Sequence, residues 1–386
     1  MTQGTYCPTC GTTYPEAARF CTRDGTRLER VSIPPPAPPS PNASPHAAPD
    51  APGRAPSHAR VFEPVHPDEA RASRQSRRSR SSAAAGAVPA ADVREPSAEL
   101  AQLVGQTLDG RYRIEEKVGE GGMSFVYRAT DTATGDRMAI KMLSPALSRD
   151  DNAMARLRRE AELAGKLAHP NVCHIIRLGE APGGMVYVVM PFMDGELLCD
   201  RAIREGQLAL GVVSQFVSEI ASGLHVAHEL GIVHRDLKPE NVMLCPRPDG
   251  TARAVVMDFG LAKERRVGAE VRKLTATGIV LGTPEFMSPE QLRGKPLDAR
   301  SDIYSLGLMT YELLTGQLPF SGKTQQDMMI ARLKGEPMPL RAMRPELGFP
   351  AAVEKVLLRS LARDPNDRYA TAPLFAAAFA AAARER

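Results

Sequence analysis

Two short runs of residues carry acidic, basic and amide side chains at a spacing that suits phosphoryl transfer to a hydroxyl group. They read HRDLKPEN at positions 234–241 and DFG at positions 258–260. This reaction needs positioned reactants and neutralised charge more than it needs covalent chemistry. Asp236 could orient the hydroxyl and accept its proton, and Lys238 could hold the γ-phosphate. Asn241 and Asp258 supply the hard oxygen ligands that suit Mg²⁺.

A glycine-rich turn upstream offers a place for the phosphates of a nucleotide. Residues of strand-forming type flank the turn at 112–118 and 125–129. Glycines let the backbone approach phosphates and present N–H groups to them, although an ordinary hairpin would share this local pattern. The predicted nucleotide contacts of this segment are Val118, Gly119, Glu120, Gly121, Gly122, Met123, Ser124, Phe125 and Val126.

A lysine and a glutamate downstream of the turn are predicted to work as a pair. Lys141 ends the apolar strand that contains Ala139, and its ammonium would bind the α- and β-phosphates. The segment 152–167 has apolar residues at a period of 3.6, which predicts a helix. Glu160 and Glu162 on this helix are both candidate partners of Lys141, but residues two apart point to different sides. We predict Glu160, because it borders the apolar face.

With these motifs together, residues from about 112 to 380 resemble the eukaryotic-like (Hanks-type) serine/threonine protein kinases of bacteria. Further matches are HPN at 169–171, GTP at 282–284, SPE at 288–290 in place of APE, and DIYSLG at 302–307. Arg368 matches the late arginine that would pair with Glu290, and Lys238 is typical of the serine/threonine form of the catalytic loop. The resemblance implies a two-lobed α+β fold, with a small lobe of antiparallel strands and one helix and a larger, mostly helical lobe.

The resemblance also implies how the adenine of ATP would be bound. Val126 and Ala139 should cover one face of the base and Met243 the other. Pro191 has no N–H, so it would offer only its carbonyl to the adenine, and the backbone N–H of Met193 would be the donor. Ser124 stands where the family pattern has its third glycine, which is a departure from that pattern.

The resemblance implies a non-specific serine/threonine protein kinase of signal transduction, which uses ATP and Mg²⁺ or Mn²⁺ to phosphorylate protein substrates. Its catalytic residues would be Asp236, Lys238, Lys141 and Glu160. Thr275 and Thr277 are the predicted autophosphorylation sites, a reaction that could take place within a kinase dimer. Arg235 would receive the phosphate, since phosphate pairs well with arginine. Thr283 is predicted to contact Asp236 and Lys238 in the substrate pocket.

Residues 1–30 carry a second kind of chemistry. The pattern resembles a zinc ribbon of the C-x₂-C…C-x₂-C type, with aspartate in the fourth place. The four candidate ligands are Cys7, Cys10, Cys21 and Asp24. Aspartate can ligate Zn²⁺, although its hard oxygen makes a weaker site than a fourth thiolate would. The alternative is a decayed ribbon that binds no metal.

Residues 31–103 are predicted to form a disordered linker before a kinase domain at 112–380. Pro, Ala, Ser and Arg dominate the linker, which therefore cannot bury enough apolar surface to offset its ordering entropy. Its segment 71–80 contains five arginines and no acid, but the formal net charge of the chain is only +4, so a nucleic-acid partner is not expected. No stretch reaches the length needed to cross a bilayer and there is no signal peptide, so a cytoplasmic protein without a membrane partner is expected.

Two other functions remain open at this point. One is a pseudokinase scaffold that recruits partners through the ribbon and the linker without catalysis. The complete set of Lys141, Glu160, Asp236, Asn241 and Asp258 argues against it. The other is a nucleic-acid-binding regulator that acts through the ribbon and the arginine run, and it could coexist with kinase activity.

Overall fold

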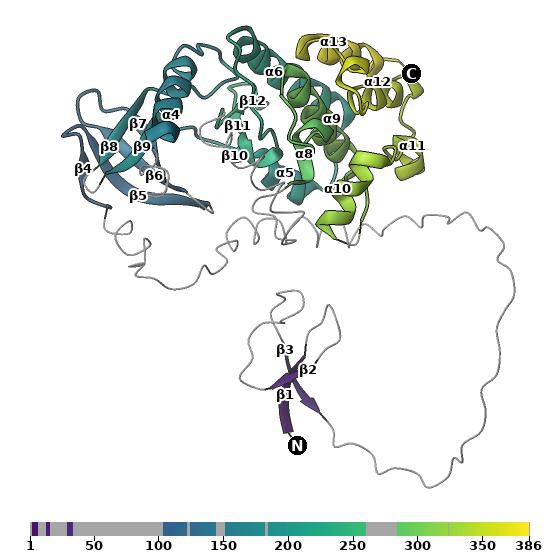
Figure 1. Ribbon diagram of the computed structural model, residues 1–386, viewed down its shortest axis with the longest axis horizontal. Helices are drawn as coiled ribbons and strands as arrows, with labels where there is room; N and C mark the ends of the chain where they lie inside the picture. Colours follow the sequence, from purple (N-terminus) through teal and green to yellow (C-terminus); the bar gives the residue numbers. More distant parts are fainter. Residues whose placement is uncertain are drawn as a thin grey trace, which may run out of the picture. The chain divides into compact units, whose positions relative to one another are not determined.

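A computed structural model describes nine stretches of the chain in two separate units, Met1–Phe62 and Glu63–Arg386 (Figure 1). The described residues are 2–6, 13–15, 29–33, 103–121, 124–143, 151–181, 184–259, 284–322 and 324–385.

The N-terminal unit contains a small antiparallel sheet. Its strands are β1 (Thr2–Tyr6), β2 (Thr13–Pro15) and β3 (Glu29–Ile33), in the order β2-β1-β3. Strand β3 pairs with β1 along its whole length, so it continues three residues beyond the predicted end of the module at residue 30. The four candidate zinc ligands and most of the predicted linker lie outside the described residues.

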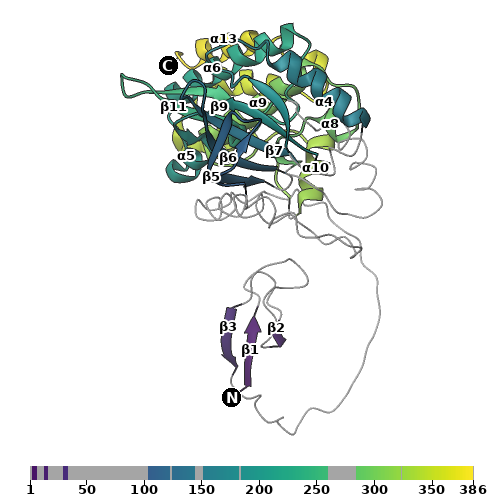
Figure 2. The same cartoon turned by 90° about the vertical axis from the view of Figure 1, so that its left-hand side faces the viewer.

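The small lobe of the second unit is a six-stranded antiparallel sheet with one helix. The strand order is β4-β5-β6-β7-β9-β8, and Figure 2 shows β5, β6, β7 and β9 side by side. Their bounds are β4 (Thr107–Leu108), β5 (Tyr112–Gly121), β6 (Ser124–Asp131), β7 (Arg137–Leu143), β8 (Arg177–Ala181) and β9 (Met185–Pro191). Alternation along β6 buries Tyr127 and Ala129 on one face of the sheet.

The helix of the small lobe, α4 (Asp151–Ala164), turns its apolar residues away from water. Met154, Leu157 and Ala161 are buried in the core that continues into the large lobe. The 3.6-residue period of the sequence therefore predicts the buried face of this helix correctly.

The large lobe is built around one central helix, α9 (Ala299–Thr315), in which every residue from Ser301 to Thr315 is buried. The helices that pack against it are α6 (Leu210–Glu229), α11 (Leu340–Met343), α12 (Ala351–Ser360) and α13 (Ala372–Ala382) (Figure 1).

The other described helices of the lobe are α5 (Leu198–Glu205), α8 (Pro289–Leu292) and α10 (Gln325–Lys334). Short 3₁₀ turns are η1 (Pro239–Asn241), η2 (Pro284–Phe286), η3 (Pro345–Leu347) and η4 (Pro365–Asp367). A small sheet of β10 (Glu196–Leu197), β11 (Val242–Pro246) and β12 (Ala252–Val256) completes the lobe. The predicted two-lobed α+β architecture is confirmed.

Helix α6 corrects one expectation. By length and composition alone it could cross a bilayer, and among the described helices it alone meets that test. Val213, Phe216 and Ile220 on this helix are instead buried in the large-lobe core, where α6 packs on α9 and α13. Its apolar character is therefore explained by its place in the core.

Candidate active site

A cleft of about 890 Å³ opens between the sheet of the small lobe and the large lobe. Both lobes and the segment after β9 contribute to its walls. The predicted site residues on its surface are Val118, Gly119, Glu120, Ser124, Val126, Ala139, Lys141, Pro191, Met193, Lys238, Asn241, Met243 and Asp258. Residues that are far apart in sequence and were predicted to bind nucleotide, phosphate and metal therefore meet in one cavity.

Several predicted residues are not on this surface. Phe125 packs against the core on the other face of the sheet, because neighbouring residues of β6 alternate between the two faces. The side chain of Phe125 therefore points away from the cleft. Gly121 is described only as the last residue of β5, and Gly122 and Met123 lie outside the described residues. Asp236 lies beside the cleft, next to Lys238 and Asn241.

The cleft also has walls that the sequence motifs do not point to. Cys173, Leu197 and Met257 add apolar surface, and Glu312 of α9 adds a carboxylate. Met257 directly precedes Asp258, so the neighbouring motif could have signalled it. No neighbouring motif marks Cys173 as part of the cleft. A contact between distant segments places it there, since its backbone N–H donates to the carbonyl of Val256. Burial raises the pKa of the Cys173 thiol to about 12, with a further contribution from the Asp258 carboxylate, so it stays protonated and unreactive at neutral pH.

Hydrogen bonds from the backbone of the catalytic-loop motif to the central helix α9 fix this motif in place. Asp302 Oδ2 accepts a hydrogen bond from the backbone N–H of His234 at 2.8 Å, and Asp302 Oδ1 accepts one from Arg235 at 3.0 Å. The His234 ring lies 2.8 Å through Nε2 from the Met257 carbonyl oxygen, and it stacks edge-on against Phe259. His234 and Asp302 are almost completely buried. The backbone of the loop is thus fixed by buried contacts before any ligand binds.

The candidate proton acceptor lies between an amide and an ammonium group. The Nδ2 amide of Asn241 donates to the Asp236 carbonyl oxygen at 2.7 Å and to its Oδ2 at 3.1 Å. Lys238 Nζ lies 3.7 Å from Asp236 Oδ2. Burial would lower the pKa of Lys238, but the nearby carboxylates, above all that of Asp236, outweigh burial and raise it. Lys238 therefore keeps its positive charge beside the proton acceptor.

The two candidate magnesium ligands fit the ion by their chemistry. Because the NH₂ group of Asn241 faces Asp236, its carbonyl oxygen remains for another partner, and Asn241 and Asp258 both line the cleft. Within the described stretches, no group of three or more His, Cys, Asp or Glu side chains could hold a metal. Mg²⁺ commonly binds through one or two protein oxygens together with substrate phosphates, so two ligands are sufficient.

The predicted ion pair between Lys141 and Glu160 is not found. Lys141 Nζ lies 2.7 Å from Asp258 Oδ2, and Glu160 Oε1 lies 3.9 Å from Arg235 Nη1. Burial would raise the pKa of Asp258, but the Lys141 ammonium outweighs burial and holds that pKa below its usual value. Glu162 is 74% exposed while Glu160 is 30% exposed, so the inward-facing glutamate is the one we predict. Lys141 has a closer carboxylate partner in this structure.

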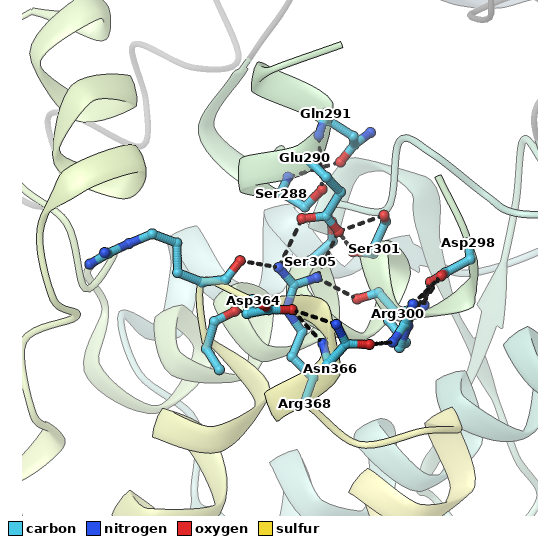
Figure 3. A network of polar contacts seen from close by, with 12 residues as sticks. Ser288, Glu290, Gln291, Asp298, Arg300, Ser301, Ser305, Asp364, Asn366 and Arg368 are labelled. Carbon is cyan, nitrogen blue, oxygen red and sulfur yellow. Dashed lines mark hydrogen bonds and ion pairs between the residues drawn. The ribbon is translucent and has the colours of Figure 1, made fainter. Parts of the chain in front are cut away.

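The pair predicted from the late arginine is confirmed and lies in a dense network (Figure 3). Arg368 donates through Nη1 and Nη2 to the two carboxylate oxygens of Glu290 at 2.7 and 2.8 Å. Ser301 Oγ donates to the same carboxylate at 2.6 Å. Burial would raise the pKa of Glu290, but hydrogen bonds from Arg368 outweigh burial and lower it. This network joins the start of α8 to the start of α9 and to the residue that follows η4.

The predicted phosphorylation sites Thr275 and Thr277 and the substrate-pocket residue Thr283 lie outside the described residues. The described structure resumes at η2, directly after Thr283. From there α8 begins with a capping box between Ser288 and Gln291.

Comparison with known proteins agrees with this geometry. The family model of the protein kinase domain matches residues 112–380. The serine/threonine-protein kinase pkn3 of Myxococcus xanthus is 39% identical over 294 residues, which are 76% of this chain and 53% of that protein. The serine/threonine-protein kinase PknB of Mycobacterium tuberculosis is 38% identical over 268 residues, 69% of this chain and 42% of that protein. The chain thus spans about half the length of these relatives.

A solved structure matches as well. The crystal structure of the kinase domain of Mycobacterium tuberculosis PknI superposes with a TM-score of 0.57 at 30% identity. The match covers 72% of this chain and 98% of the PknI domain. The family model covers more than half of the chain, and the chain belongs to the protein kinase family.

Proposed function

We propose that this chain transfers the γ-phosphate of ATP to serine and threonine hydroxyls of protein substrates. The observation that carries the proposal is the position of Asp236, with Lys238 at 3.7 Å and the Asn241 amide at 3.1 Å beside a nucleotide-sized cleft. The relatives named serine/threonine-protein kinases, at 38% and 39% identity, support the choice of hydroxyl. Lys238, two residues after Asp236, supports it too.

The described residues divide the work of such a transfer. Asp236 would accept the proton of the attacking hydroxyl, a contribution of about 10²–10⁴ in rate for a positioned base. Lys238 would stabilise negative charge on the transferred group, and Lys141 would hold the other phosphates. Asn241 and Asp258 would hold the divalent cation, Mg²⁺ or Mn²⁺. When bound, that cation neutralises charge on the phosphates.

The base of ATP would lie between apolar side chains of both lobes. Val126 and Ala139 line the cleft from β6 and β7, and Met243 lines it from β11. Pro191 and Met193 also line the cleft, and their backbone groups would meet the polar edge of the base. Apolar walls with a few fixed polar groups are typical of cofactor sites.

The test uses the full chain, radiolabelled ATP and a generic basic protein. Asp236→Asn changes only a proton acceptor and its charge, so it should fold and bind ATP but lose most transfer. Asp249→Asn, in the exposed turn between β11 and β12, is the matched control and should stay active. The phosphate should be recovered on serine and threonine. Transfer by Asp236→Asn within a few-fold of wild type, or phosphate on tyrosine alone, would refute the proposal.

We further propose that autophosphorylation of Thr275 and Thr277 switches the kinase on. The support is that Lys141 is paired with Asp258, and Glu160 lies near Arg235, in what we interpret as a resting arrangement. A phosphate carries about −1.5 to −2 charges and would be a stronger partner for Arg235 than a carboxylate is. Glu160 would then be released toward Lys141.

Mass spectrometry tests this switch directly. Wild-type protein should carry phosphate on one or both threonines, and Asp236→Asn protein should carry none. Mixing active wild type with tagged Asp236→Asn protein shows whether the reaction runs between two copies of the chain. Phosphate on neither threonine of the active protein would mean that the kinase is switched in another way.

We also propose that residues 1–30 bind one Zn²⁺ through Cys7, Cys10, Cys21 and Asp24. The support is the spacing of the cysteines, with the first pair lying between β1 and β2. Cys7→Ser should remove the metal measured by elemental analysis, whereas Cys199→Ser in the kinase domain should not. Asp24→Cys should raise the affinity, because it adds a fourth soft ligand. Metal-free wild-type protein prepared without chelators would rule the site out.

A further inference from the structure

The peptide unit that precedes Asp236 is held in an uncommon conformation. Arg235 has a φ of +64°, in the left-handed region that non-glycine residues rarely adopt. Such a residue persists only where its surroundings over-determine it. The N–H of Arg235 is held by Asp302, as described above, at 3.0 Å. Its carbonyl oxygen is held by a second element, because it accepts a hydrogen bond from Gln291 Nε2 at 2.7 Å.

The side chain of Gln291 is buried and makes two hydrogen bonds, one to Ser288 and one to Arg235. Gln291 is only 1% exposed, at the end of the first turn of α8. Its Oε1 accepts from the backbone N–H of Ser288 at 2.9 Å, which leaves Nε2 pointing to the Arg235 carbonyl. The backbone N–H of Gln291 donates separately to Ser288 Oγ at 3.3 Å (Figure 3). Two distinct sets of bonds therefore meet at this residue, one within α8 and one to the catalytic loop.

Holding the carbonyl of Arg235 fixes the orientation of Asp236. The Arg235 carbonyl and the Asp236 N–H belong to one planar peptide unit, so they cannot turn independently. We propose that Gln291 is a positioning residue for phosphoryl transfer, which orients this peptide plane and thereby the Asp236 carboxylate. The proposal rests on the proposed function of Asp236 as proton acceptor. Asp302 binds the backbone N–H of Arg235, and Gln291 binds the Arg235 carbonyl in the peptide unit that leads to Asp236.

The informative variant is Gln291→Glu, which keeps the size of the side chain. Its carboxylate can still accept from Ser288 but cannot donate to the Arg235 carbonyl. We expect kcat to fall about tenfold to a hundredfold, as a small misplacement of a catalytic group can. The KM for ATP should stay within about twofold, because Gln291 does not line the cleft.

A pH profile separates positioning from a general loss of structure. Burial raises the pKa of a carboxyl group at such a site, so it becomes protonated at mildly acidic pH. The protonated acid can donate to the Arg235 carbonyl as the amide does. The ratio of Gln291→Glu activity to wild-type activity should therefore rise as the pH falls. The uncharged Gln291→Met should lose kcat to a similar extent without this recovery.

Ser288→Ala is the matched control. It removes the Ser288 Oγ bond of the capping box but leaves both bonds of the Gln291 amide, so kcat should stay near that of wild type. Thermal unfolding of each variant identifies any that has lost its fold. Wild-type kcat in both Gln291 variants would overturn the proposal, and so would equal losses in Ser288→Ala. If wild type itself transfers no phosphate, the proposed function fails instead, so the two failures are distinguishable.

Discussion

The interior of the large lobe and the junction between the two lobes are held together in different ways. On the large-lobe side, the polar contacts are buried and multiple: Asp302 is 1% exposed, and the side chains of Arg368 and Glu290 are 0% and 7% exposed. Where the two lobes meet, Lys141 of the small lobe and Asp258 of the large lobe are 17% and 31% exposed, and Glu160 of α4 is 30% exposed. The backbone of the catalytic loop is thus fixed by buried contacts, while the charged side chains at the junction between the lobes remain partly exposed.

This difference has an energetic consequence. Breaking a buried ion pair costs about 3–5 kcal/mol, because one charge is left uncompensated. An exposed pair contributes only about 0–1 kcal/mol. Ligand binding or a phosphate can therefore change the partner of Lys141, whereas the Glu290–Arg368 pair should persist in every state of the kinase.

The largest effect is expected from Glu290→Gln, which would leave Arg368 buried without its anion. We expect the free energy of unfolding to fall by about 3–5 kcal/mol, measured by denaturant titration. Arg363→Ala is the control, because its pair with Glu336 is exposed (39% and 86%) and should contribute no more than about 1 kcal/mol. Similar small losses in both variants would remove the contrast between buried and exposed ion pairs.

The same pair predicts how stability depends on pH. The pKa of Glu290 is lower in the folded protein than in the unfolded chain, so the folded state favours the ionised form. Its contribution to stability is therefore present above the ordinary glutamate pKa of about 4.3 and is lost as the pH falls through the lowered folded value. Glu290→Gln should flatten this part of the acid unfolding curve. An unchanged acid limb would contradict the assignment.

The next largest effect is expected from Lys141→Met. This substitution removes the phosphate-binding ammonium that we expect to change its carboxylate partner. We expect kcat/KM for ATP to fall by about 10²–10³, typical for loss of one charge-stabilising donor. Stability should change little, since the pair with Asp258 is partly exposed. Lys166→Met on the exposed end of the small lobe is the control and should keep full activity. Activity near wild type in Lys141→Met would exclude its role.

A smaller effect is expected from Thr275→Ala/Thr277→Ala. Without phosphate for Arg235, the resting ion pairs should persist, and activity should fall about tenfold, which corresponds to about 1.4 kcal/mol. Kinase assays on wild type before and after phosphatase treatment should show the same factor. Thr251→Ala, in an exposed turn, is the control. A double variant as active as the phosphorylated wild type would show that these threonines do not switch the enzyme.

Sequence patterns predict much of the fold, and most of the residues that they single out line one cleft. The motifs around Asp236 and Asp258 are short and contiguous. Their residues therefore stay close together in the structure, as the sequence predicts. The period of α4 likewise separates Glu160 from the exposed Glu162. These are local properties, which depend on spacing along a single element.

Pairings between distant segments were less predictable. Lys141 could meet Glu160 or Asp258, and only the three-dimensional arrangement decides between two carboxylates. The glycine-rich segment predicts a nucleotide contact for Phe125 as for its neighbours, but strand alternation turns its side chain to the other face of the sheet. Gln291 belongs to no catalytic motif, and its contact with Arg235 joins residues 56 positions apart. Such contacts depend on tertiary packing, which no local pattern contains.

The central claim is that Lys141 exchanges its partner while the loop around Asp236 stays fixed. The most direct measurement is a crystal structure of the phosphorylated full chain with Mg²⁺ and a non-hydrolysable ATP analogue. We predict that Lys141 Nζ moves to within about 4 Å of the Glu160 carboxylate, the distance of an ion pair. The bonds from Asp302 and Gln291 to Arg235 should be unchanged. Lys141 still bound to Asp258 in that complex, with Glu160 still beside Arg235, would contradict the account.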